Sequence, residues 1–155
     1  MSATTSHAYG VGLIAVLIGL SASVVFYTSF YLPESLAKPS VPIHILEPDG
    51  ELIIKIVDGA VIEGNPNYVP NKGEALLTIS NLVRWINEDT TAHTVTPDHR
   101  YTDGYSGDFG SPGVIKPGDS YEFLFTEAGE IHYFCQPHPW MKGTLKVEKI
   151  GRAHV

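Results

Sequence analysis

Four side chains that bind soft metal ions stand out by type and spacing. Cys135, His138 and Met141 follow one another as Cys-x2-His-x2-Met, and His93 offers a second imidazole from upstream. A short loop that leaves a strand can turn the first three inward onto one ion. Two histidines and a cysteine in a trigonal plane, with a weak axial methionine, form the type 1 (blue) copper arrangement. The sequence therefore predicts one type 1 copper ion per chain.

Cys135 is the single cysteine of the chain, so it has no partner for an intramolecular disulfide. A lone thiol in an exported protein is open to oxidation unless it is buried or bound to metal. A single cysteine, histidine or methionine usually has an ordinary structural role, such as packing in the core. Four such residues at the spacing of metal ligands favour a copper site. The other histidines are expected to lie outside the site, and strand alternation points His132 away from Cys135. They are His7, His44, His99, His132 and His154.

The chemistry expected of such a site is electron exchange. A type 1 site has a full set of protein ligands, so it cycles between Cu(I) and Cu(II) and leaves no position for a substrate. A dinuclear copper centre of the oxidase kind needs two cysteines, and the chain has one. We therefore expect no enzymatic activity and no small-molecule substrate. The expected partners are a protein that donates electrons and a protein that accepts them.

The segments that position these ligands have the pattern of short strands separated by Gly, Pro and Asn. No segment after the N-terminal apolar run has a helical period of useful length. The pattern predicts an all-β sandwich over residues 43–150, with the Cys135 loop between its last two strands. The predicted strands are residues 51–57, 75–80, 82–87, 121–125, 131–134 and 144–148.

The N-terminal part of the chain has the composition of a membrane anchor. Residues 8–32 carry no charge, and 25 residues at about 1.5 Å each exceed the roughly 30 Å hydrocarbon core of a bilayer. A cleaved signal peptide is disfavoured because the apolar run continues past the small residues 21–23. We expect a transmembrane helix over 8–32, after a short tail (1–7) and before a proline-containing linker (33–42). Residues 151–155 form a C-terminal tail.

The charge distribution excludes one class of partner. The net charge is −7, and every charged side chain lies at or after Glu34. Nucleic-acid binding needs a basic surface that replaces the counterions of the phosphates, and this chain offers none. No nucleic acid is expected.

Over about residues 43–149 the sequence resembles the cupredoxins, and its ligand loop is most similar to that of the amicyanins. The resemblance is carried by the four ligands, by Trp85-x-Asn87 and by the segments 64–70 and 125–129. It implies a Greek-key β-sandwich and weak docking of partners at the His138 edge, framed by Pro137, Pro139 and Trp140. Phe134 is expected to face outward, where plastocyanins present an aromatic at a second docking area. Thr94 departs from the pattern, because plastocyanins and amicyanins have an asparagine there that braces the ligand loops. Its backbone N–H is still expected to donate to the Cys135 sulfur, and its hydroxyl is expected to replace the amide in part.

The resemblance also supplies an orientation. Because cupredoxin sites are loaded outside the cytoplasm, we expect a single-pass membrane protein with a cytoplasmic N-terminus and an extracytoplasmic copper domain. An anchored carrier meets membrane-bound redox complexes at raised effective concentration. We therefore expect a membrane-anchored carrier of single electrons between redox partners at the outer face of the membrane. Two alternatives remain open: a fixed electron-relay subunit of a membrane oxidoreductase complex, and a copper delivery or storage protein.

Overall fold

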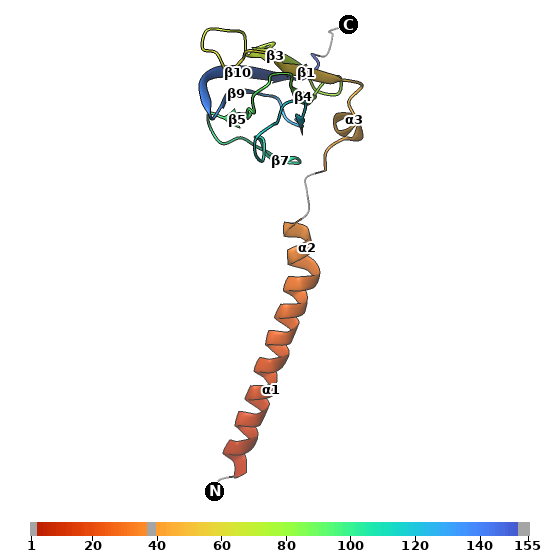
Figure 1. Ribbon diagram of the computed structural model, residues 1–155. Helices are drawn as coiled ribbons and strands as arrows, with labels where there is room; N and C mark the ends of the chain where they lie inside the picture. The colour runs from red at the N-terminus through yellow and green to blue at the C-terminus, as the bar shows by residue number, and fades with distance from the viewer. Residues whose placement is uncertain (1–2, 37–39, 152–155) are drawn as a thin grey trace. The chain divides into compact units, whose positions relative to one another are not determined.

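The computed structural model describes residues 3–36 and 40–151. The chain divides into two compact units, residues 1–38 and 39–155. The first unit is helical and the second contains all the strands (Figure 1). The helix begins as α1 (Ala3–Phe26), continues through a π-helical turn η1 (Tyr27–Tyr31), and ends as α2 (Leu32–Ser35).

The helix thus starts before residue 8 and continues past Pro33, where the sequence favours a connector. Proline has no backbone N–H to continue an α-helical ladder. The π-helical turn lies just before it, where the Leu32 N–H donates to the Tyr27 carbonyl. Such a turn is a common way for a helix to absorb an irregularity.

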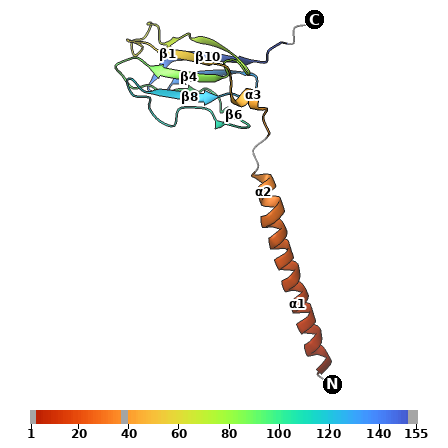
Figure 2. The ribbon, with the colours of Figure 1, turned by 90° about the vertical axis from the view of Figure 1, so that its right-hand side faces the viewer.

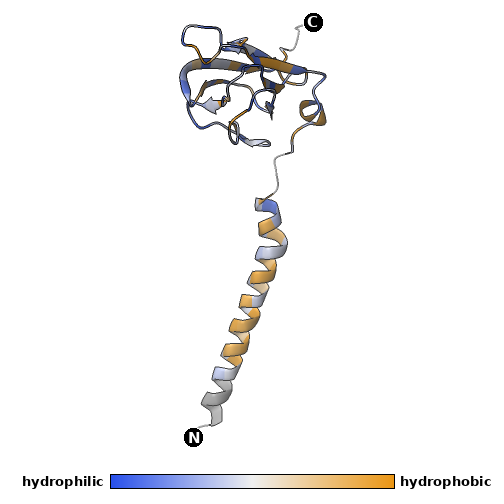
Figure 3. Cartoon of the chain, viewed as in Figure 1, coloured by the Kyte–Doolittle hydropathy of each residue, from blue (hydrophilic) through white to orange (hydrophobic). Residues whose placement is uncertain are grey.

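Residues Tyr9–Ser35 are long and apolar enough to cross a membrane, a property that signal sequences share. From Tyr9 onward the described side chains of this unit are exposed. Apolar residues occur along most of its length, and the hydrophilic end lies at α2 (Figure 3). A helix that is apolar all round needs an apolar environment to cover it.

The second unit is a sandwich of two four-stranded sheets (Figures 1 and 2). The first sheet has the order β2 (Tyr68–Val69), β1 (Glu51–Ile56), β4 (Leu82–Asn87), β8 (Ser120–Leu124). The second has the order β3 (Lys72–Leu76), β10 (His138–Glu148), β9 (Gly129–Cys135), β5 (Thr96–Pro97). Within these sheets β1 pairs in parallel with β4, as β3 does with β10, whereas the other pairs are antiparallel. A small hairpin joins β6 (Thr102–Asp103) and β7 (Gly107–Asp108).

This architecture confirms the predicted all-β sandwich. The six predicted strands all have counterparts, but the one expected over 75–80 is instead β3, Lys72–Leu76. The chain turns immediately after Leu76, whose carbonyl accepts the N–H groups of Ile79 and Ser80. Thr78 has a φ of 76° in this turn, which ends the extended conformation.

Aromatic rings fill the space between the sheets. Tyr133 is 1% exposed and meets Trp85 and Tyr68 edge-on, with ring centroids 5.6 and 5.0 Å apart. Its ring also covers Gly143, the residue opposite it on β10. A Cβ at Gly143 would lie 2.2 Å from Tyr133 Cζ, so only glycine fits. This close approach fixes β10 against β9 immediately after the ligand loop.

The start of this unit is not a strand. Residues Ile43–Leu46, which lie within the range predicted to be an all-β sandwich, form a single helical turn, α3. Ile45 packs against the core, and its carbonyl accepts a hydrogen bond from the buried Asn81 side chain at 2.8 Å. The Asn81 amide also donates to the Phe125 carbonyl at 2.7 Å. Four residues are too few to show a helical period, so this turn depends on tertiary contacts.

Candidate metal centre

The β9–β10 turn presents three of the four predicted ligands. Cys135 is the last residue of β9 and pairs with His138, the first residue of β10. The pairing is irregular between His138 and Lys142, and Met141 lies within this irregular stretch. Cys135 and Met141 are both fully buried, whereas His138 is half-buried. The irregularity bends the strand so that residues three apart, His138 and Met141, both reach the interior.

His93 comes from a separate loop that begins at the end of β4. It bridges to Ile115 through two backbone hydrogen bonds, His93 N–H to Ile115 O and Ile115 N–H to His93 O. The fully buried Asn87 side chain donates to the carbonyls of Ile115 and Thr91, both at 2.8 Å. These contacts hold the His93 backbone in place beside the Cys135 turn.

The structure brings three predicted ligands together. The donor atoms of His93, Cys135 and His138 all lie within 4.8 Å of one another. Cys135 Sγ is 3.6 Å from His93 Nδ1 and 3.5 Å from His138 Nδ1. With bond lengths like those of zinc, about 2.0 Å to nitrogen and 2.3 Å to sulfur, a trigonal ion separates such atoms by about 3.7 Å. The spacing therefore fits one ion in the plane of the three atoms, with donor types that suit copper.

A buried carboxylate that the sequence analysis did not identify orients His93. Asp89 Oδ2 lies 2.7 Å from His93 Nε2, and both side chains are at most 1% exposed. The other carboxylate oxygen accepts the N–H groups of Gly59 and Thr90. With Nε2 engaged as a donor, the Nδ1 of His93 is left facing the Cys135 sulfur. The sequence shows an acidic residue four positions before the histidine. That spacing alone does not indicate that the Asp89 side chain is buried.

The electrostatics of Cys135 and His138 favour the forms that bind metal, whereas those of His93 favour its protonated form while no metal is bound. Burial alone would raise the pKa of the Cys135 thiol, but the His93 ring and the Thr94 N–H bring it below its ordinary value. Burial and the nearby His93 lower the pKa of His138, which favours its neutral imidazole. For His93, burial opposes protonation, yet Cys135 and Asp89 together raise its pKa. The thiolate and neutral imidazole are the ligand forms of these side chains.

Thr94 joins the two ligand loops. Its backbone N–H donates to Cys135 Sγ at 3.3 Å, as the sequence analysis expected. Its hydroxyl oxygen accepts the Gln136 N–H at 2.8 Å. The backbone carbonyl of Thr94 accepts the buried Tyr68 hydroxyl at 2.6 Å. The loop that follows His93 is thus tied to the loop that follows Cys135.

The surroundings of His138 reach the surface. Trp140 is 38% exposed, and its ring lies 5.5 Å from that of His138, centroid to centroid. Phe134, expected to face outward, is half-buried. The histidines expected outside the site and described in detail, His44, His99 and His132, are exposed. The His7 side chain and His154 lie outside the described residues.

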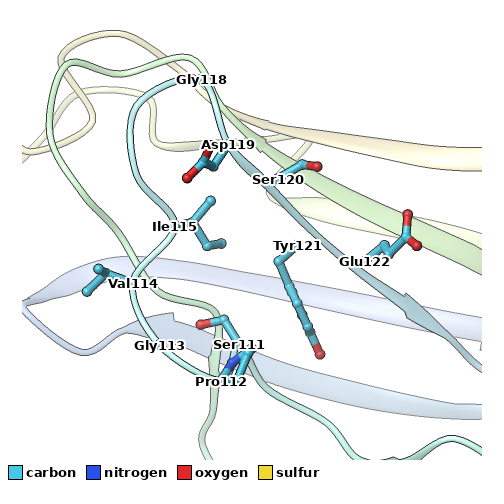
Figure 4. A pocket seen from close by; sticks show the side chains of 10 residues that line it. All are labelled: Ser111, Pro112, Gly113, Val114, Ile115, Gly118, Asp119, Ser120, Tyr121 and Glu122. Atoms are coloured by element: carbon cyan, nitrogen blue, oxygen red, sulfur yellow. The ribbon is translucent and has the colours of Figure 1, made fainter.

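A pocket lies beside the site and is distinct from it (Figure 4). Its walls are residues 111–115 and 118–122, and the four predicted ligands are not among them. Ile115 lines the pocket and also pairs with His93, so it adjoins both the pocket and the metal centre. Tyr121 crosses the pocket from β8, and its hydroxyl accepts the Gly110 N–H at 3.0 Å.

Known proteins match this chain in sequence and in fold. The sequence profile of copper-binding proteins of the plastocyanin/azurin family matches residues 64–148. Amicyanin from Paracoccus denitrificans is 30% identical over 95 residues, which cover 61% of this chain and 70% of the relative. Amicyanin from Paracoccus versutus is 33% identical over 76 residues, 48% and 54% of the two chains. A purple cupredoxin from Nitrosopumilus maritimus has a similar structure, with a TM-score of 0.51 and 27% identity, over 63% of this chain and all of that one.

Proposed function

The chain belongs to the plastocyanin/azurin family of copper-binding proteins, and we propose that it is a membrane-anchored carrier of single electrons. In this proposal His93, Cys135, His138 and Met141 hold one type 1 copper ion. The observation that carries it is the buried cluster of Cys135 Sγ and two imidazole Nδ1 atoms, 3.5 and 3.6 Å from the sulfur.

The residues around the site suit electron exchange. Copper bound there supplies a Cu(I)/Cu(II) couple. The thiolate and the two imidazoles come from backbone segments that hydrogen bonds and strand pairing already fix. Met141, fully buried on β10, offers the thioether as the fourth ligand. A ligand set that moves little between oxidation states lowers the reorganisation that accompanies each transfer.

The route for electrons is proposed to run through the His138 edge, the surface formed by His138, Pro137, Pro139 and Trp140. His138 is half-buried and the other three are exposed, so a redox protein reaches this ligand without disturbing the site. The surface is small and apolar. Such surfaces suit partners that must release as readily as they bind.

The anchor is proposed to be an uncleaved helix, Tyr9–Ser35, with its N-terminus in the cytoplasm and the copper domain outside. Support for the length comes from the continuous helix to Ser35. The chain enters the copper domain at α3, which Asn81 holds at the start of β4, whereas Asn87 at the end of β4 holds the His93 loop. About 17 Å of strand separates these ends. Within the copper domain, α3 therefore meets β4 at the end opposite the His93 loop.

A fixed relay subunit is the second candidate. Gly12 and Gly19 of α1 are seven residues apart, so they share one face of the helix, and neither has a neighbouring atom within 4 Å of where a side chain would project. Small residues let a second membrane helix approach closely, so this face suits packing within a larger complex. A stoichiometric complex that survives detergent extraction and sizing would favour this role, and a monomeric chain would favour the mobile carrier.

The proposal is tested on the full-length chain in detergent. Intact mass should include residues 1–35, and the protein should stay with membranes washed in alkaline carbonate. A redox titration should fit one electron per chain and repeat over many cycles without loss of copper. A mature protein that begins after residue 23 and is released by the wash would contradict the anchor. Copper that passes readily to a chelating acceptor during cycling would favour delivery instead.

A further inference from the structure

The hydroxyl of Thr94 sits among three polar atoms at the edge of the metal centre. Its oxygen is 2.8 Å from Gln136 N, 3.0 Å from Thr96 Oγ1 and 4.0 Å from Cys135 Sγ. Thr94 is 8% exposed, and Thr96 is half-buried in β5. The three polar atoms near this hydroxyl therefore all belong to residues in the interior of the protein or at the edge of its surface.

The hydrogen bonds of this hydroxyl can be counted. A threonine hydroxyl has one proton and two lone pairs. Gln136 N–H occupies one lone pair of the Thr94 oxygen, because an N–H can only donate. The Thr94 proton then has two acceptors within reach, the Thr96 oxygen and the Cys135 sulfur. When the Thr96 oxygen accepts the Thr94 hydroxyl proton, the sulfur receives only the backbone N–H of Thr94 from this loop. When the Thr96 hydroxyl instead donates to the Thr94 oxygen, the Thr94 hydroxyl proton is free to donate to the sulfur as well.

We propose that Thr94 and Thr96 form a pair of hydroxyls that sets how many hydrogen bonds the Cys135 sulfur receives, and through them the reduction potential. The inference rests on the proposed function, in which Cys135 is a copper ligand. A sulfur bound to Cu(I) carries more negative charge than one bound to Cu(II), so an added donor stabilises the reduced form more. Thr96 competes with the sulfur for the Thr94 proton, and at 3.0 Å it is the nearer acceptor.

The same hydroxyl has a second task that does not depend on copper. By accepting the Gln136 N–H, Thr94 braces the turn between β9 and β10 against the His93 loop. Here a threonine hydroxyl takes the bracing place that an asparagine amide holds in the resembling families. Thr94 and Thr96 are positioning residues in this account, because they act on the metal through Cys135.

The test uses four variants of the full-length chain in detergent: Thr94→Val, Thr96→Val, the double variant and Thr94→Ser. Valine keeps the β-branched shape and removes the hydroxyl. Thr96→Val should raise the reduction potential, because the Thr94 proton loses its competing acceptor. The expected change in the Cu(I)/Cu(II) ratio at fixed applied potential is about fivefold, the factor of one ordinary hydrogen bond. Thr94→Val should not raise the reduction potential. In the double variant, Thr96→Val should change the potential no further than Thr94→Val alone.

Amide hydrogen exchange of Gln136 in the copper-free protein provides the second readout. Thr94→Val should speed this exchange, whereas Thr96→Val and Thr94→Ser should leave it unchanged. The pair is refuted if Thr96→Val shifts the potential equally with and without the Thr94 hydroxyl, or leaves it unchanged. The brace is refuted if Gln136 exchange is insensitive to Thr94→Val. A wild-type protein without sulfur-to-copper absorption would overturn the proposed function itself, while the exchange measurement would still decide the brace.

Discussion

The Asp89 carboxylate and the His93 ring form a buried pair in which Oδ2 lies 2.7 Å from Nε2. The pair fixes which ring nitrogen faces Cys135, so the metal centre extends beyond its four proposed ligands. Outer partners of this kind hold ligand rings in orientation and adjust their basicity.

Replacing Asp89 with asparagine should weaken copper binding and raise the reduction potential. The amide keeps the shape but removes the negative charge that favours the more positive Cu(II) form. Loss of such a partner typically costs roughly 10- to 100-fold in metal affinity. Competition with a chelator of known affinity measures the copper affinity, and a redox titration measures the reduction potential.

Glu88→Gln is the matched control for this substitution. Glu88 is the adjacent acid, but it is partly exposed and pairs with Lys55 on the surface at 2.8 Å. Removing its charge should leave affinity and potential nearly unchanged. Equal effects of the two substitutions would show that net charge, rather than the bond to His93, is responsible.

Substituting Gly143 with alanine should destabilise the copper domain. The new methyl group would lie within 2.2 to 2.5 Å of the Tyr133 ring, which is itself packed on all sides by the core. Overpacking of this kind costs about 1–3 kcal/mol or more. Urea unfolding of the copper-free chain measures it, with Gly129→Ala as control, because a Cβ at Gly129 meets no atom within 4 Å. Equal stability of the two variants would contradict the close packing of Tyr133 on β10.

Asp103 should make stability depend on pH in the acid range. Burial by itself would raise its pKa, but the N–H groups of Ser106 and Thr126, the Thr126 hydroxyl and the Tyr105 N–H lower it overall. A carboxyl with a lowered folded-state pKa contributes stability above its unfolded pKa, near 4, and loses it as pH falls through the folded value.

Asp103→Asn should therefore cost stability at pH 7 and little at the acid end. A cost of about 1.5–3 kcal/mol is expected at neutral pH, because the amide presents a donor where the carboxylate accepted N–H and O–H groups. Unfolding curves of both proteins between pH 7 and pH 2 measure the difference. A difference that stays constant over this range would contradict the role of the charged form.

The candidate ligands could be predicted from the sequence because three of them have a recognisable local spacing. Cys135, His138 and Met141 are close in the chain, and the motif makes sense only if a strand ends at Cys135, as β9 does. Asp89 was missed because it is buried in the folded chain, where it accepts a hydrogen bond from the N–H of Gly59, thirty residues earlier. No local pattern contains that contact.

The fold also contains elements that local sequence patterns predict and elements that depend on contacts distant in the chain. Strands with alternating apolar residues, such as β4 with Val83 and Trp85 buried, follow from the sequence. The α3 turn does not, because its geometry depends on the bond between the Asn81 amide and the Ile45 carbonyl across thirty-six positions. The strands of two residues were not identified either, since two residues cannot display an alternation.

The most direct test of the central claim is the visible absorption of the full-length chain loaded with Cu(II). The account predicts an intense sulfur-to-copper band that bleaches on one-electron reduction and is lost in Cys135→Ser. It should persist in His132→Ala, which removes an exposed histidine. A colourless Cu(II) protein, or a Cys135→Ser variant that keeps the band, would contradict a copper site built on Cys135.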